Sequence, residues 1–142
     1  AQLMQSHAQK AGIAINVVRE PDDGYWSNVW LKKPWSMCYW GSRPTIDMMF
    51  TTALAADATW NDTRWKNPRF NELLLAARGE TDEAKRQAMY AEMQQLLHDD
   101  GGQLVLMFYN FVGALSTAVA HGELNSDQDS DGGYMVERWW MA

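Results

Sequence analysis

The stretch that decides the fold is "NPRFNELLLAARGETDEAKRQAMYAEMQQLLHDDGGQLVLMF", residues 67–108. It opens with Asn67 followed by Pro68, a cap residue and then a proline at the first helical position, where a missing N–H costs nothing. Gly79 is a natural end for the helix that these two residues begin. The opening of the stretch therefore predicts a helix from Pro68 to Gly79.

A second and longer helix follows in the same stretch. The polar residues 81–83 begin it, and its apolar pattern continues to about Asp99. Its apolar side chains recur at helical spacing, so they form one inner stripe. This stripe consists of Met89, Met93, Leu96 and Leu97. Beyond the glycines at 101 and 102, the run 103–109 is typical of a strand, so the stretch predicts two helices leading into a strand.

Two further apolar runs lie upstream and also predict strands. They are "IAINVV", residues 13–18, and "WSMCYW", residues 35–40. Strands that alternate with helices indicate parallel βαβ units and hence the α/β fold class. Three strands make a thin sheet for this class, so we expect residues outside this chain to complete it.

Helices are predicted between these strands. Residues 2–11 have apolar side chains at helical spacing, and Asp22 or Asp23 can cap a short helix that follows the first strand. Thr45 begins another helix after the second strand. Residues 55–67 are polar and aromatic without a period, and we expect them to form a loop.

Composition narrows the classes of protein that the chain can belong to. A net charge of −6 argues against a nucleic-acid-binding surface, which needs a clustered excess of lysine and arginine. No run of about 18 apolar residues occurs, so no membrane-spanning helix is expected. The chain begins within a helical pattern and without a start methionine, which indicates a piece of a longer protein. Its single cysteine cannot form an internal disulfide.

The best candidate site is "YWGSRPT", residues 39–45, where the second predicted strand ends. Ligands of open α/β sheets bind outside the carboxyl ends of the strands. Gly41 lets a ligand approach the backbone, Ser42 adds a hydroxyl, and Arg43 offers donors matched to a carboxylate or phosphate. Trp40 can stack on a flat or apolar group. The segment therefore predicts a ligand contact.

A simpler interpretation of the same residues stays open. Arg43 can pair with Asp47, four residues on, while Trp40 is part of the core. Tyr109 and Asn110 end the last predicted strand, and that end should face the same crevice. They are weaker ligand-binding candidates.

Metal and catalytic sites have little support. "DQDSDG", residues 127–132, resembles the start of a calcium loop, but its twelfth position is Arg138 where a bidentate carboxylate is needed. A solvated acidic loop is the favoured interpretation. The histidines show no metal spacing, and no motif of a nucleophile or phosphate loop is present. We expect no metal, no cofactor and no enzymatic activity.

The order of these motifs resembles the C-terminal part of family 5 extracellular solute-binding proteins, the peptide, dipeptide and nickel type of ABC-transporter binding proteins. Residues 3–26, "LMQSHAQKAGIAINVVREPDDGYW", are similar to the family's helix, turn and strand. Residues 39–50, "YWGSRPTIDMMF", are similar to its tryptophan motif. The stretch 67–108 is the most specific match, and "ERWWMA", 137–142, looks like a family C-terminus.

This resemblance implies part of a two-lobed periplasmic-binding-protein fold, type II and cluster C-like. Residues 1–118 would belong to the second lobe, and residues 119–142 would return toward the first. The protein would capture a small-molecule or oligopeptide solute between its lobes and deliver it to an ABC-transporter membrane permease. It would act as a monomer, in the periplasm or as a lipid-anchored extracellular protein.

The tryptophan motif departs from the pattern of peptide-binding members at one position. Those members have Trp-x-x-Asp, and the resemblance implies that the aspartate pairs with a peptide's ammonium group. Trp40 fits the pattern, but Arg43 stands at the aspartate position. A guanidinium repels an ammonium and attracts a carboxylate, phosphate or sugar acid, so we expect an anionic solute.

Two other functions are weighed against this one. A stand-alone carbohydrate-binding module rich in tryptophan predicts exposed, coplanar aromatic rings and binding by the isolated chain. A hydrolase of small amides or glycosides needs a carboxylate placed for catalysis, which the sequence does not indicate.

Overall fold

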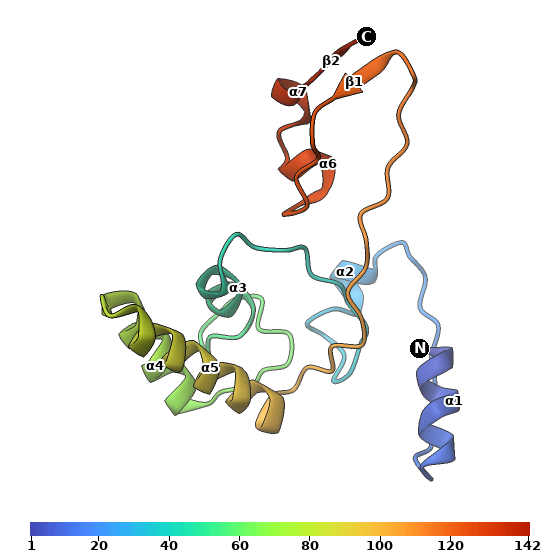
Figure 1. The fold of residues 1–142 in the computed structure, drawn as a ribbon. Coiled ribbons are helices and arrows are strands. Elements are labelled where there is room, and N and C mark those ends of the chain that lie inside the picture. The colour runs from blue at the N-terminus through green and yellow to red at the C-terminus, as the bar shows by residue number, and fades with distance from the viewer. The chain divides into compact units, whose positions relative to one another are not determined.

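Helices dominate the chain, and its strands form one short antiparallel pair (Figure 1). The computed structural model describes all residues from 1 to 142. The elements in chain order are α1 (Gln2–Lys10), α2 (Tyr25–Asn28), α3 (Ile46–Ala53), α4 (Pro68–Gly79), α5 (Glu83–Asp100), β1 (Val119–His121), α6 (Asp129–Gly132), α7 (Met135–Arg138) and β2 (Trp139–Met141). The chain divides into two compact units, residues 1–39 and 40–142.

The three predicted strands are absent. Residues 13–18, 35–40 and 103–109 contain no strand, and none of them takes part in the β1–β2 pair. A strand exists only where a neighbour accepts and donates its backbone hydrogen bonds, and these segments have no such neighbour. Their large apolar side chains are mostly exposed, for example Phe108 at 94%. The prediction of strands here is therefore wrong for this chain, and a larger α/β sheet stays a prediction.

The predicted helices around the core are confirmed, together with their capping residues. The Thr45 hydroxyl accepts a hydrogen bond from the Met48 amide at 3.2 Å, which begins α3. The Asn67 side chain accepts one from the Phe70 amide at 3.1 Å and begins α4. Asp82 caps α5 in the same way. Each cap satisfies an amide at the helix start that has no partner within the helix.

One predicted cap is wrong. Helix α2 begins after Gly24, whose φ is +75°, and not after Asp22 or Asp23. Glycine adopts this left-handed conformation without steric cost, so the chain can turn sharply into the helix there. Helix α1 ends before Gly12, which is also left-handed with φ of +77°.

Removing the cap of α4 is expected to lower stability measurably. Asn67→Ala should reduce the free energy of unfolding by about 1 kcal/mol, because the Phe70 amide loses its acceptor. Asn67→Ser keeps a capping oxygen and should restore most of this loss. Urea denaturation of the three proteins measures the difference, and equal midpoints for alanine and serine would contradict the role of the cap.

Helices α3, α4 and α5 enclose the core of the second unit. Helices α4 and α5 lie side by side, and α3 packs on α4 (Figure 1). Phe70 and Met93 are the largest fully buried side chains. The ring of Phe70 lies 5.1 Å from those of both Phe50 and Trp65, between centroids. The predicted inner stripe of α5 is confirmed, since all its members belong to or pack on this cluster.

A polar contact joins α3 to α4. Arg78 donates from Nε to Asp47 Oδ1 at 2.9 Å and from Nη2 to Oδ2 at 3.2 Å. The hydroxyl of Tyr90, on α5, donates to Asp47 Oδ1 at 3.3 Å. Burial, followed by the charge of Asp47, raises the pKa of Tyr90. Asp47 thus holds the three helices together.

The first unit has a smaller set of contacts. Gln5 of α1 donates from Nε2 to the carbonyl of Ile15 at 2.7 Å. The Tyr25 hydroxyl donates to the carbonyl of Met37 at 2.6 Å. The ring of Trp26 makes an edge-on contact with Tyr39, with 5.3 Å between centroids. The contacts of Tyr25 and Trp26 bring the two ends of residues 25–39 together.

No helix of the chain has both the length and the apolar character that crossing a bilayer demands.

Candidate functional site

Residues 40–43 begin the second unit, and the contacts of Trp40 there include the helical core, Asp62 and Trp60. Its side chain packs on the helical core. Its Nε1 donates to Asp62 Oδ2 at 3.3 Å, and its ring lies 6.2 Å from that of Trp60 at an interplanar angle of 52°. The expectation that Trp40 is part of the core is therefore met in part. The indole is half-buried, and its orientation is set by contacts on both an edge and a face.

Arg43 does not pair with Asp47. The carboxylate of Asp47 is taken by Arg78, so that interpretation is wrong. The guanidinium instead lies over the ring of Trp40, with Cζ 6.0 Å from the centroid. Its Nη1 donates to the carbonyls of Gly41 at 3.1 Å and Ser42 at 3.0 Å. The cation is thus held by a π face and by backbone oxygens.

This arrangement leaves part of the guanidinium unused. Both hydrogen bonds of Arg43 come from Nη1, and none of the ion pairs includes this residue. Nε and Nη2 therefore keep donors for a partner that brings its own negative charge. A guanidinium presents such donors as a fork, which matches a carboxylate or a phosphate.

The structure gives Gly41 and Ser42 contacts within the chain, and their ligand-binding role stays a prediction. A Cβ at Gly41 would lie 3.7 Å from Nη1 of Arg43, an ordinary contact, so the backbone there does not require glycine. The Ser42 hydroxyl donates to the carbonyl of Asp127. Ser42 therefore contributes to the connection with the acidic loop, although its side chain is exposed.

Tyr109 and Asn110 are not brought to this segment. The ring of Tyr109 contacts that of Phe111, with 5.5 Å between centroids and an interplanar angle of 79°. No hydrogen bond or ring contact joins either residue to residues 40–43, and both lie in an exposed, extended stretch. The structure therefore gives these two candidates no shared place with Arg43.

Three further residues belong to the site and were missed in the sequence. Asp62 accepts hydrogen bonds from Trp40 and, at 3.4 Å, from Nε2 of Gln103. Trp60 supplies the second indole. Asp62 is 22 residues from Trp40, in the loop 55–67 that has no period. Only the tertiary fold brings them together, and no spacing in the sequence indicates it.

The acidic loop near the C-terminus is ordered by a buried carboxylate and is not simply solvated. The side chain of Asp131 is 2% exposed. Its Oδ1 accepts from the Asn125 amide at 2.6 Å and from Nη1 of Arg138 at 3.0 Å, and its Oδ2 accepts from Nε1 of Trp139 at 3.0 Å. Ser130 and Asp131 both have positive φ, and two glycines with positive φ follow.

Asp131 is also one of the acidic residues of the calcium-like stretch 127–132, and its oxygens have partners within the protein. Asp131 already serves three donors, so it is not a free ligand for a cation. Nowhere in residues 1–142 do three or more His, Cys, Asp or Glu side chains gather in a way that could hold a metal ion.

The hydrogen bonds to the Asp131 carboxylate are expected to break only at acidic pH. The hydrogen bond from the Asn125 amide lowers the pKa of Asp131, and Trp139 and the charge of Arg138 act in the same direction. A lowered folded-state pKa gives stability that is present above the unfolded value and lost as the pH falls through the folded value. The indole resonance of Trp139 should therefore show a transition below about pH 4 that reports the protonation of Asp131.

Asp131→Asn is the control for this pH dependence. The amide cannot ionise, so the Trp139 resonance of the variant should no longer change with protonation at this position. An acidic transition that persists unchanged in the variant would contradict the assignment to Asp131.

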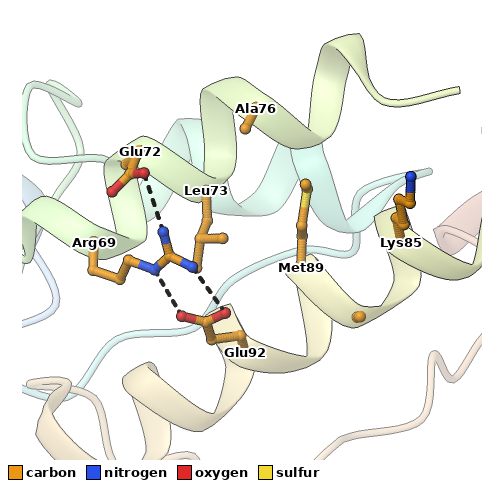
Figure 2. Close-up of a pocket in the computed structure, with 8 residues that line it drawn as sticks. Arg69, Glu72, Leu73, Ala76, Lys85, Met89 and Glu92 are labelled. Atoms are coloured by element: carbon orange, nitrogen blue, oxygen red, sulfur yellow. Dashed lines mark hydrogen bonds and ion pairs between the residues drawn. The ribbon is translucent and has the colours of Figure 1, made fainter. Parts of the chain in front are cut away.

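A shallow groove of about 350 Å³ runs between α4 and α5 (Figure 2). Arg69 of α4 spans it and donates from Nε to Glu92 Oε1 at 2.7 Å and from Nη1 to Glu72 Oε1 at 3.1 Å. These bonds raise the pKa of Arg69 and, through the hydrogen bond from Arg69, lower that of Glu92. Because its donors are taken by carboxylates of the protein, Arg69 connects the two helices and is a poor anion site.

Comparison of the chain with models of protein families, with curated proteins and with solved structures gave no match.

Proposed function

We propose that this chain is part of the solute-binding component of an ABC importer and that Arg43 binds an anionic group of the solute. One observation carries the proposal. The guanidinium of Arg43 is fixed over Trp40, has no carboxylate partner, and keeps Nε and Nη2 available. A carboxylate, phosphate or sugar acid, or the carboxylate of a peptide-like solute, is the chemistry that these donors suit.

The unpaired apolar segments support the same proposal. Residues 13–18, 35–40 and 103–109 have the composition of strands but no neighbour to pair with. A two-lobed α/β protein would provide the rest of the sheet, with residues 1–118 in its second lobe and 119–142 returning toward the first. Closure of the lobes would hide the solute, and contacts made only in the closed state would hold it.

The proposed function also implies where the protein works and which partner it has. The protein would work as a monomer without catalysis, in the periplasm or lipid-anchored outside the cell, and would pass its solute to a membrane permease. A carbohydrate-binding module is less well supported. It calls for coplanar aromatic rings, whereas Trp40 and Trp60 are inclined at 52°.

Native mass spectrometry of the full-length protein that contains this chain tests the proposal. Gentle purification should retain a small anionic molecule on the wild-type protein. The Arg43→Ala variant, purified in the same way, should lose it. The mass of the bound molecule would identify its chemical class.

Two results would contradict the proposal at different levels. A peptide retained equally by both proteins would keep a transport function but remove Arg43 from the ligand site. Carbohydrate binding by residues 1–142 alone would favour the stand-alone module, because an importer lobe lacks half of its cleft.

A further inference from the structure

Asp62 lies where three separate parts of the second unit meet. Its Oδ2 accepts the Nε1–H of Trp40 at 3.3 Å, and its Oδ1 accepts Nε2–H of Gln103 at 3.4 Å. Trp40 belongs to the candidate site, and Gln103 begins the extended segment after α5. One carboxylate, from the loop 55–67, thereby binds both segments through different oxygens.

The hydrogen bond between Asp62 and Trp40 also affects Arg43, because the guanidinium lies over the indole ring that this bond orients. The guanidinium lies over the ring at 6.0 Å, so its position depends on how that ring is turned. The ring of Trp60 restricts movement of the Trp40 ring from another side, with 6.2 Å between the two centroids. A rotation of the indole would move its N–H edge, and this is the edge that Asp62 holds. A hydrogen bond to a carboxylate is shorter and stronger than one to a neutral acceptor.

We propose that Asp62 is a positioning residue of the solute site, which acts through Trp40 to hold the Arg43 guanidinium where an anion can reach it. The inference rests on the proposed function, because it assumes that Arg43 binds the anion. Asp62 does not itself touch the solute. Its negative charge is directed at N–H donors of the protein, among them those of Trp40 and Gln103, which limits its repulsion of an anion at Arg43.

The test uses the full-length protein with inorganic phosphate and benzoate as probe anions. Calorimetric titration gives the dissociation constant of each probe, and the Nε1–H resonance of Trp40 reports the indole contact. Asp62→Ala should shift this resonance and weaken binding of the better probe about tenfold. Asp62→Asn keeps an oxygen acceptor for the indole and should retain the affinity within about threefold. Asp57→Ala, an exposed carboxylate from the same loop, is the matched control and should change neither quantity.

The outcomes separate this inference from the proposed function. If Arg43→Ala weakens binding but Asp62→Ala leaves it unchanged, or if asparagine fails to rescue the alanine defect, the positioning role is overturned and the function stands. If Arg43→Ala has no effect on either probe, or neither probe binds the wild type, the assignment of the anion site to Arg43 is overturned together with this inference, whereas transport of another solute is not. A lower melting temperature of Asp62→Ala with an unchanged Trp40 resonance would mark Asp62 as structural only.

Discussion

Phe70→Ala is expected to lower the free energy of unfolding by about 3–5 kcal/mol, the range for removing a buried aromatic ring. Phe70 has no exposed surface, and its ring touches Phe50 and Trp65 from two sides. Helices α3 and α4 and the loop before α4 converge on this ring, so the cavity cannot close without moving all three. Urea denaturation, followed by tryptophan fluorescence, measures the loss.

Leu75→Ala is the matched control because it lies on the same helix. Leu75 is 69% exposed, so its truncation should change the free energy of unfolding by no more than about 0.5 kcal/mol. If both variants unfolded at the same denaturant concentration, the core would not be centred on Phe70.

Arg43→Ala is expected to weaken binding of the natural anionic solute about 30-fold, which corresponds to roughly 2 kcal/mol for a lost charged hydrogen bond. Arg43→Lys should give an intermediate loss. Lysine keeps the positive charge, but it lacks the planar fork that lies on Trp40 and can bind two oxygens. Isothermal titration of the full-length protein with the solute identified by mass spectrometry provides the affinities.

Lys66→Ala controls for net charge in this series. Lys66 is exposed and removing it changes the overall charge by the same amount as Arg43→Ala, so an effect of charge alone would appear in both variants. An affinity of Arg43→Ala within about threefold of the wild type would rule out a direct contact between Arg43 and the solute.

Local signals in the sequence predicted the helices well. Asn67 with Pro68, and Asp82 at the start of α5, act on amides only two or three residues away, so they can be identified without knowing the rest of the fold. The strands differ because a strand depends on a partner elsewhere. Residues 103–109 have the right composition, but composition cannot supply the missing neighbour.

The same distinction holds for the candidate site. The close spacing of Arg43 and Asp47 suggested an ion pair, yet the fold brings Arg78 to Asp47 from 31 residues away. Trp40 and Arg43 were found because they lie only three positions apart in the sequence. Asp62 was missed because its contact with Trp40 exists only after the loop has folded onto the helices.

The backbone around Asp131 has the opposite handedness to the helices on which the rest of the chain is built. Ser130 and Asp131, with φ of 53° and 61°, adopt a left-handed turn that costs an L-amino acid roughly 1–2 kcal/mol per residue. The three hydrogen bonds to the Asp131 carboxylate offset this cost. Chirality and charge are therefore linked at this turn, because neutralising the Asp131 carboxyl group weakens hydrogen bonds that favour the left-handed backbone.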